Sequence, residues 1–187
     1  MLELNNISLR FGEKRVLENQ NLTLNPGHRL AIMGPSGCGK TTLIRVALGL
    51  AKPTAGTVKN TFSSVGVVFQ EPRLLPWRTA LENVNLVLGD GRESMEKAAG
   101  YLAQVGLADA RDKLPRELSG GMQQRVALAR ALAMDADCLI LDEPFKAMDD
   151  ALRCQIIGLV NQTHAAMMLV THDEQEADTL ECEILRL

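Results

Sequence analysis

A glycine-rich loop near residue 37 has the residue types and spacing of a phosphate-binding loop. It matches G-x-x-x-x-G-K-[ST] through Gly34, Pro35, Ser36, Gly37, Cys38, Gly39, Lys40 and Thr41. The glycines let the backbone fold back, so that successive N–H groups converge on an anion. We expect Lys40 to reach the β- and γ-phosphates and the Thr41 hydroxyl to bind Mg²⁺. The loop predicts ATP binding; a chance match by a glycine-rich turn is the alternative.

Two adjacent carboxylates follow a second apolar run, Cys138–Leu141. Asp142 and Glu143 are expected at the carboxyl end of a buried strand, where open α/β sheets hold their ligands. Asp142 would then reach the Mg²⁺ held by Thr41, and Glu143 would orient or deprotonate the water that attacks the γ-phosphate. An ordinary surface turn before Pro144 is the alternative, and the phosphate loop argues against it.

Two further positions complete the candidate chemistry. His172 follows the apolar run Met167–Val170 and could contact the γ-phosphate, although a lone histidine often serves only as a surface or capping residue. Ser119 precedes Gly120, Gly121 and an apolar helical pattern, which makes a second anion-binding helix N-terminus or a plain serine cap. One ATP does not need two such cradles in one chain.

The elements around these residues indicate an α/β fold. Leu30–Met33, Val65–Phe69, Cys138–Leu141 and Met167–Val170 are short apolar runs typical of buried strands. Thr42–Leu48 has helical spacing directly after the phosphate loop. Strands that alternate with helices predict a parallel sheet with crossover helices.

Two other regions have different patterns. Residues 1–30 contain short apolar alternations broken by Gly12 and by Pro26-Gly27, which predict a small antiparallel sheet of short strands. From Glu71 to about Met134 the apolar spacing is helical. We therefore expect one domain, with residues 1–70 and 135–187 forming a nucleotide-binding core with a β subdomain and residues 71–134 forming a helical subdomain.

Composition limits the possible functions. The 187 residues are 46% hydrophobic, enough for one sizeable core, and the net charge of −3 gives no global attraction to nucleic acid. The apolar runs are far shorter than the ~20 residues of a membrane span. Residues 1–6 lack the pattern of a secretory signal, and the four cysteines form no C-x-x-C pair. The cytoplasm is the expected compartment.

Taken together, the motifs resemble those of an ABC transporter ATP-binding subunit. Residues 34–42, Gln70, 118–125, 141–144 and His172 stand in the order and approximate spacing of that family. The resemblance covers almost the whole chain and implies a P-loop NTPase (RecA-like) core, with a helical insert that carries the signature motif. It extends the nucleotide-binding loop to Thr42.

The resemblance also assigns roles to residues that mean little alone. Phe11 stands where the family stacks an aromatic ring, more often Tyr, on adenine. Gln70 resembles the loop glutamine that meets the metal or the attacking water and relays nucleotide state to a membrane partner. Lys40, Gln70, Glu143 and His172 would serve catalysis, and Thr41, Gln70 and Asp142 would serve Mg²⁺.

In this family, Ser119, Gly120 and Gly121 would cover the γ-phosphate of ATP held by the opposite subunit. The resemblance thus implies a homodimer with two ATP molecules sandwiched between identical chains. The loop that ends at Asp149 would cross the dimer interface. The chain departs from the family pattern at Lys146 and Met148 in this loop and at Met122 directly after the signature glycines.

The segment 69–84 resembles that of the ATPases of nitrate, sulfonate, taurine and thiamine-precursor importers. This implies a cytoplasmic subunit, peripheral on the inner face of the membrane, that powers solute uptake through permease subunits with an extracytoplasmic solute-binding protein. Trp77 would either fill the core of the helical subdomain or face the permease. The nature of the solute lies with the permease and binding protein.

Other classes of P-loop protein fit less well. Repair and chromosome ATPases carry long coiled coils between phosphate loop and signature, whereas Lys40 and Ser119 are 79 positions apart here. Translation factors of this type carry two cassettes in one chain. A P-loop kinase would leave Ser119 and His172 without a role, and a module without turnover would not need Glu143. An exporter ATPase stays open as an alternative.

Overall fold

The computed structural model describes residues 1–89, 91–146 and 148–187. Residue 147, in the loop expected to cross the dimer interface, therefore lies outside the described residues. The centre is a parallel sheet in the order β5-β6-β7-β3-β8. Its strands are Val65–Val68 (β5), Cys138–Asp142 (β6), Ala166–Val170 (β7), Arg29–Met33 (β3) and Glu183–Arg186 (β8).

Side chains alternate between two hydrophobic cores on the central strands. On β6, Cys138 and Ile140 pack into the core that contains α1 (Lys40–Ala47), whereas Leu139 and Leu141 pack into the core that contains the other long helices. All five residues of β6 and of β7 are buried. A sheet covered on both faces explains why these strands read as continuous apolar runs. The predicted α/β class with a parallel sheet is confirmed.

A three-stranded antiparallel sheet, β2-β1-β4, packs beside the central sheet. The expectation of several short strands is wrong, because β1 (Leu2–Phe11) and β2 (Lys14–Leu24) are long and continuous. Register shifts on β1 separate Leu4 from Ile7 and put both side chains in the same core. Such bulges break the alternation that marks one strand in a sequence. The third strand, β4, spans Ala55–Asn60.

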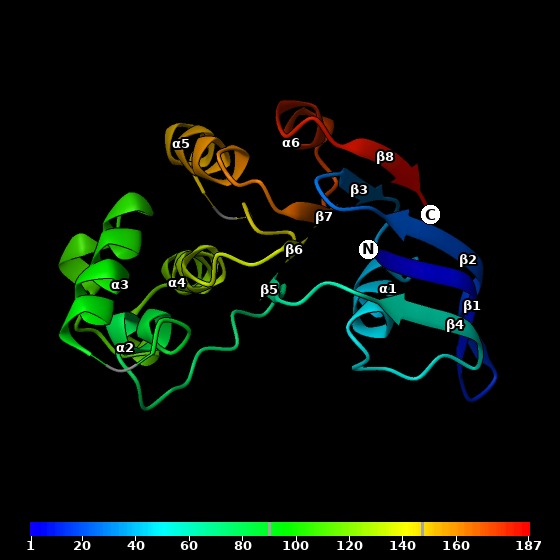
Figure 1. The fold of residues 1–187 in the computed structure, drawn as a ribbon, viewed down its shortest axis with the longest axis horizontal. Coiled ribbons are helices and arrows are strands. Elements are labelled where there is room, and N and C mark those ends of the chain that lie inside the picture. The colour runs from blue at the N-terminus through cyan, green and yellow to red at the C-terminus, as the bar shows by residue number, and fades with distance from the viewer. Residues whose placement is uncertain (90, 147) are drawn as a thin grey trace.

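The helical region begins later than the sequence pattern suggests. Residues 71–79 form an irregular segment, and helix α2 starts only at Ala80, where Thr79 and Glu82 form a capping box. The helices that follow are α2 (Ala80–Asn85), α3 (Arg92–Gln104) and α4 (Gly120–Ala133), with short 3₁₀ turns at Ala108–Ala110 and Pro115–Glu117. Figure 1 shows α2 and α3 at one end of the molecule and β1, β2 and β4 at the other.

Helix α6 (Glu174–Thr179) and strand β8 had no prediction from the sequence, whereas a helix between β6 and β7 was expected from the apolar spacing of Leu152, Ile156, Leu159 and Val160. Helix α5 (Asp150–Asn161) leads to β7, and α6 then leads to the edge strand β8, which pairs in parallel with β3. β8 is short and only partly buried, so it lacks a continuous apolar run. Within the described residues, no helix is both long and apolar enough to cross a bilayer.

Candidate nucleotide site

The phosphate loop joins β3 to α1 in a conformation that requires glycine. Gly37 and Gly39 have φ of +82° and +110°, which L-residues with side chains rarely adopt. A Cβ atom on Gly39 would lie 2.8 Å from the carbonyl oxygen of Val16, so a methyl group has no room there. Gly39 is also the N-cap of α1 and supplies no side-chain cap. The first N–H groups of the helix therefore stay available to an anion, as a phosphate cradle needs.

The ammonium of Lys40 lies over the same loop. Its Nζ atom donates to the carbonyl oxygens of Gly34 at 2.7 Å and of Pro35 at 2.9 Å. The loop thus holds a cation beside the N–H groups of α1. A positive charge next to convergent donors fits the phosphate chain of a nucleotide.

Thr41 and Asp142 meet although they are far apart in sequence. The Thr41 hydroxyl donates to Oδ2 of Asp142 at 2.8 Å, because α1 starts beside the carboxyl end of β6. Asp142 is only 1% exposed. Burial raises the pKa of this carboxyl, and the hydrogen bond from Thr41 opposes the rise. A buried carboxylate next to a hydroxyl is a donor pair that suits Mg²⁺.

The chain offers few further ligands to a metal. Among residues 1–89, 91–146 and 148–187, no group of three or more His, Cys, Asp or Glu side chains could hold an ion. Mg²⁺ is commonly bound by one or two protein groups together with substrate phosphates and water. The Thr41–Asp142 pair fits this arrangement, in which the nucleotide itself completes the site.

Glu143 occupies a constrained position at the end of β6. Its φ is +48°, in the left-handed region that is unusual for a residue with a side chain, and its N–H donates to the carbonyl oxygen of Val170 at 2.9 Å. Strained backbone of this kind persists where the surroundings hold it, often at functional sites. The Glu143 carboxylate accepts from Nε2 of Gln70 at 3.4 Å. The candidate base and the loop glutamine therefore face each other.

These groups line one cavity of about 520 Å³. It brings together most of the predicted site: Phe11, Ser36, Gly37, Cys38, Gly39, Lys40, Thr41, Thr42, Gln70, Asp142 and Glu143. Phe11 is 61% exposed, so its ring is free to stack on a base. The cavity also includes three residues that the sequence analysis missed, Lys14, Arg15 and Val16. Only their place shortly after Phe11, at the start of β2, could have indicated them.

His172 and Ser119 lie outside this cavity. His172 lines a neighbouring hollow of about 160 Å³ that shares Glu143 with the first. Ser119 is exposed at the N-terminus of α4, where its Oγ accepts from the N–H of Met122 at 3.3 Å. Gly120 is exposed beside it. The cavity of one chain therefore brings together the phosphate loop, the predicted metal ligands and the predicted base, but not the signature turn.

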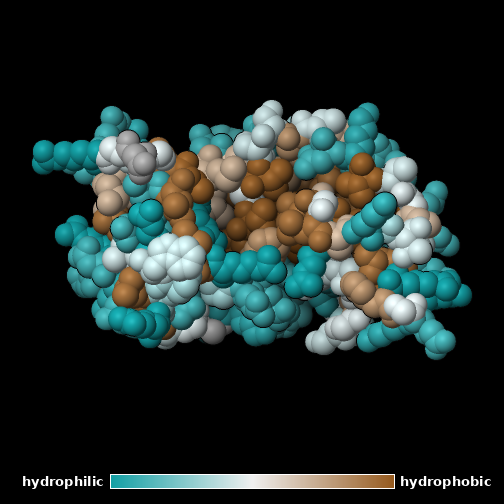
Figure 2. All heavy atoms as spheres, turned by 90° about the horizontal axis from the view of Figure 1, so that it is seen from below, coloured by the Kyte–Doolittle hydropathy of each residue, from teal (hydrophilic) through white to brown (hydrophobic). Residues whose placement is uncertain are grey.

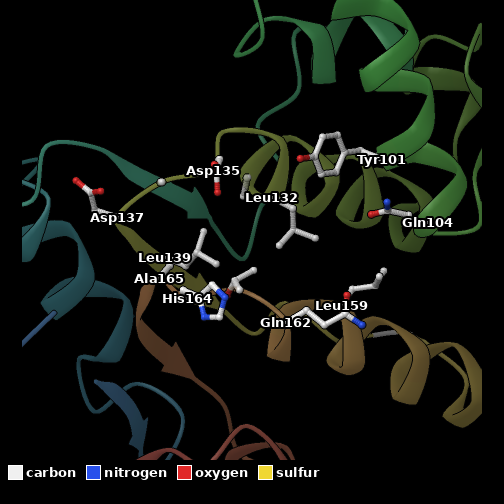
Figure 3. Close-up of a pocket in the computed structure, with 13 residues that line it drawn as sticks. Tyr101, Gln104, Leu132, Asp135, Asp137, Leu139, Leu159, Gln162, His164 and Ala165 are labelled. Carbon is white, nitrogen blue, oxygen red and sulfur yellow. The ribbon is translucent and has the colours of Figure 1, made fainter. Parts of the chain in front are cut away.

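A second large cavity lies away from this chemistry. It has a volume of about 450 Å³ and opens between α3, α4 and α5 (Figure 3). Its lining includes Asp137 and Ala165, which directly precede β6 and β7, so it lies at the amino ends of these strands. Ligands of open α/β sheets bind at the carboxyl ends. None of the predicted site residues lines this cavity.

Comparison with known proteins agrees with the geometry. Residues 17–146 match the model of a family described as ABC transporter. The chain is 44% identical to the aliphatic sulfonates import ATP-binding protein SsuB 1 of Rhodococcus jostii, with 100% of this chain and 78% of the relative covered. It is 47% identical to SsuB 3 of Paraburkholderia xenovorans, with 94% and 72% covered.

Solved structures show the same fold. An ATP-binding cassette solved as a dimer in a post-hydrolysis state with ADP and Pi superposes with a TM-score of 0.90 at 33% identity, covering 100% of this chain and 94% of that one. A bacterial ABC transporter cassette, also solved as a dimer, gives 0.90 at 32% identity. The chain belongs to the ABC transporter family, as a subunit that binds and hydrolyses ATP.

Proposed function

We propose that this subunit powers the import of a small organic anion, with aliphatic sulfonates as the leading candidate. The two relatives quoted above are both named for aliphatic sulfonate import. The observation that carries the proposal is the single cavity that holds the phosphate loop, Asp142, Gln70 and Glu143. ATP hydrolysis in that cavity would release the energy. The names of the relatives indicate the direction of transport, which is import, and the class of solute.

In the proposed site, Lys40 and the N–H groups of α1 bind the β- and γ-phosphates, and Phe11 stacks on adenine. Thr41, Asp142 and Gln70 are the proposed ligands for Mg²⁺, which when bound offsets the charge of the phosphates. Glu143 orients and deprotonates the attacking water. His172, in the neighbouring hollow that shares Glu143, would contact the γ-phosphate.

We further propose that the active unit is a homodimer. The signature turn at Ser119 is exposed and does not line the cavity of its own chain, which supports a phosphate supplied by a second copy. Both structural neighbours were solved as dimers. ATP would then join two surfaces, and hydrolysis would remove the γ-phosphate that links them.

Contacts of α4 connect the nucleotide cavity to the helical region, residues 71–134, which we propose moves as a subdomain. The guanidinium of Arg130 donates to the carbonyl oxygens of Pro72 and Arg73, both at 3.2 Å. The buried Gln124 donates to the carbonyl oxygen of Phe69 at 3.2 Å. In the proposed function, these contacts would pass a shift of Gln70 to the helix that begins with the signature turn.

The segment after Gln70 presents a tryptophan to solvent. Trp77 is 70% exposed, so the interpretation that it fills the core is wrong. The fully buried Asn83 holds the loop around it, because its side chain binds the N–H and carbonyl of Leu75 and the carbonyls of Arg78 and Thr79. An exposed aromatic ring on a fastened loop is typical of a binding surface.

We propose that the permease docks on this side of the molecule. The segment after β5 runs along the lower edge of Figure 1, and the face seen from below in Figure 2 has a hollow in which hydrophobic side chains gather. Such a surface suits the apolar side of a membrane subunit's helix. The subunit would then sit on the inner face of the cell membrane, and an extracytoplasmic solute-binding protein would deliver the solute.

Uptake by cells with a Trp77→Ala variant tests this proposal. We expect loss of sulfonate uptake and of copurification with a polytopic membrane protein, while ATP hydrolysis by the isolated subunit is retained. Met134→Ala, which truncates another exposed apolar side chain at the end of α4, is the matched control. Recovery of the subunit with nucleic acid or ribosomes instead of a permease would overturn the transport function.

A further inference from the structure

A lysine that departs from the family pattern contacts the proposed catalytic base. Nζ of Lys146 lies 3.0 Å from Oε2 of Glu143. Nε2 of Gln70 donates to the same oxygen at 3.4 Å. Gln70 lines the nucleotide cavity, whereas Lys146 lines the smaller hollow that contains His172. Glu143 therefore stands between two hollows and is contacted from both.

The backbone fixes this contact. The chain turns directly after β6, with the N–H of Lys146 donating to the carbonyl oxygen of Glu143 at 3.4 Å. Phe145, between the two, is buried at 2% exposure and anchors the turn in the core. The Glu143 and Lys146 side chains are 20% and 59% exposed. The ammonium is thus tethered near the base while it stays accessible to water.

The other cation of this hollow is already paired with acids. Arg153 on α5 contacts Asp150 at 2.5 Å and Asp173 at 3.6 Å. Glu176 accepts a hydrogen bond from the Thr171 hydroxyl at 2.5 Å. Among the described lysine and arginine side chains that line this hollow, Lys146 is therefore the one that contacts Glu143.

We propose that Lys146 is a positioning residue that restrains Glu143 and slows ATP hydrolysis. The inference rests on the proposed role of Glu143 as the base. To meet the attacking water, Glu143 must turn its carboxylate into the nucleotide cavity, whereas Lys146 holds Oε2 from the side of the smaller hollow. The contact therefore stabilises the ground state more than the transition state. For a partly exposed pair, the expected restraint on kcat is about 2–5-fold.

Lys146→Met tests the inference, because methionine keeps most of the chain length and removes the charge. We expect kcat at saturating Mg-ATP to rise about 2–5-fold, with KM for ATP changed by less than about twofold. Lys146→Arg keeps the charge and should stay slower than Lys146→Met. Lys97→Met is the matched control, since it removes a similar ion pair with Glu93 at 2.7 Å on the exposed surface of α3.

Salt gives a second readout that a purely structural role would not produce. Because salt screens exposed charges, raising it should narrow the difference in kcat between wild type and Lys146→Met. A kcat for Lys146→Met at or below that of wild type, or a raised KM, would overturn the inference. Glu143→Gln separates the two claims. If it hydrolyses ATP normally, the proposed base is wrong; if it is inactive and Lys146→Met is not faster, only the restraint is wrong.

Discussion

Two helix N-termini in this chain prepare for phosphate in different ways. Helix α1 begins after Gly39, which has φ of +110° and no side chain, so no side-chain group competes for its first N–H groups. Helix α4 begins after Ser119, whose own hydroxyl accepts from the N–H of Met122 at 3.3 Å. One terminus is left open and flanked by Lys40, whereas the other is capped from within its own chain.

The difference matches the unequal tasks that we propose for the two ends. The α1 terminus combines open donors, a lysine and the Thr41–Asp142 pair in one cavity, so it can hold a nucleotide by itself. The α4 terminus is exposed, and the nucleotide cavity does not include it. In the proposed homodimer it would add hydrogen bonds to a phosphate that the partner chain already holds, which suits a group that closes a site rather than forms it.

The largest expected effect comes from removing the lysine beside the N-terminus of α1. Lys40→Ala removes the cation beside the phosphate cradle and should lower ATP hydrolysis by about 10²–10³-fold or abolish binding. Fluorescent-nucleotide binding and phosphate release measure the two effects. Lys52→Ala, at an exposed lysine outside the cavity, should behave as wild type. Equal losses in both variants would mean that general charge, not the cradle, binds ATP.

Blocking ATP hydrolysis should make the proposed contact of the α4 N-terminus with a partner's ATP visible as a stable dimer. Glu143→Gln keeps the shape of the side chain but cannot accept the proton, so turnover should fall by about 10²–10⁴-fold. The bound γ-phosphate would then persist and hold two copies together, which size-exclusion chromatography with Mg-ATP detects as a dimer. A Gln variant that stays monomeric at saturating Mg-ATP, even with the permease supplied, would contradict the shared-nucleotide dimer.

Substitution of Ser119 tests whether the signature turn meets phosphate. Aspartate is as good an N-cap as serine, so Ser119→Asp should keep α4 stable while its charge repels the γ-phosphate of the partner. We expect normal thermal stability and no ATP-dependent dimer when Glu143→Gln is also present. Ser119→Ala instead removes the cap and should cost about 0.5–2 kcal/mol of stability. A dimer that survives the aspartate would show that Ser119 does not meet phosphate.

The same contrast shows what the sequence reveals. The phosphate loop could be predicted from its residues because its chemistry is local, with glycines for positive φ and Lys40 three residues after Gly37. The Asp142 partner also followed, since parallel strands end at one edge. Lys146 beside Glu143 could be noticed only as a departure, because the turn that brings the two together depends on the burial of Phe145.

Strand lengths and non-local pairs were harder to predict. The length of β1 was underestimated because its bulge shifts the apolar alternation between Leu4 and Ile7. β8 was missed because its position depends on pairing with β3, more than 150 residues earlier in the chain. Trp77 could not be placed, since apolar composition does not distinguish a core residue from one that the buried Asn83 holds at the surface. In each case the deciding contact is distant in sequence.

The smallest expected effect concerns the carboxylate beside the open terminus. Burial raises the pKa of Asp142, so the folded state disfavours its ionised form. At a pH below the pKa of the unfolded chain, the carboxyl is protonated in both states and no penalty exists. As the pH rises from the unfolded pKa through the raised folded pKa, the unfolded chain gives up this proton more readily, so the free energy of unfolding falls. Without nucleotide, Asp142→Asn should therefore be more stable than wild type at neutral pH.

Thermal unfolding across pH measures this effect. A gain of about 1 kcal/mol, a common size for a single substitution, would raise Tm by about 2–4 °C at pH 7, with the difference shrinking in acid. Asp109→Asn, at an exposed carboxylate, should show no such gain. Since the Asn variant loses a charged ligand for Mg²⁺, Mg-ATP should stabilise it less than it stabilises wild type. A variant that is less stable at every pH would mean that the carboxylate already has a compensating partner within the chain.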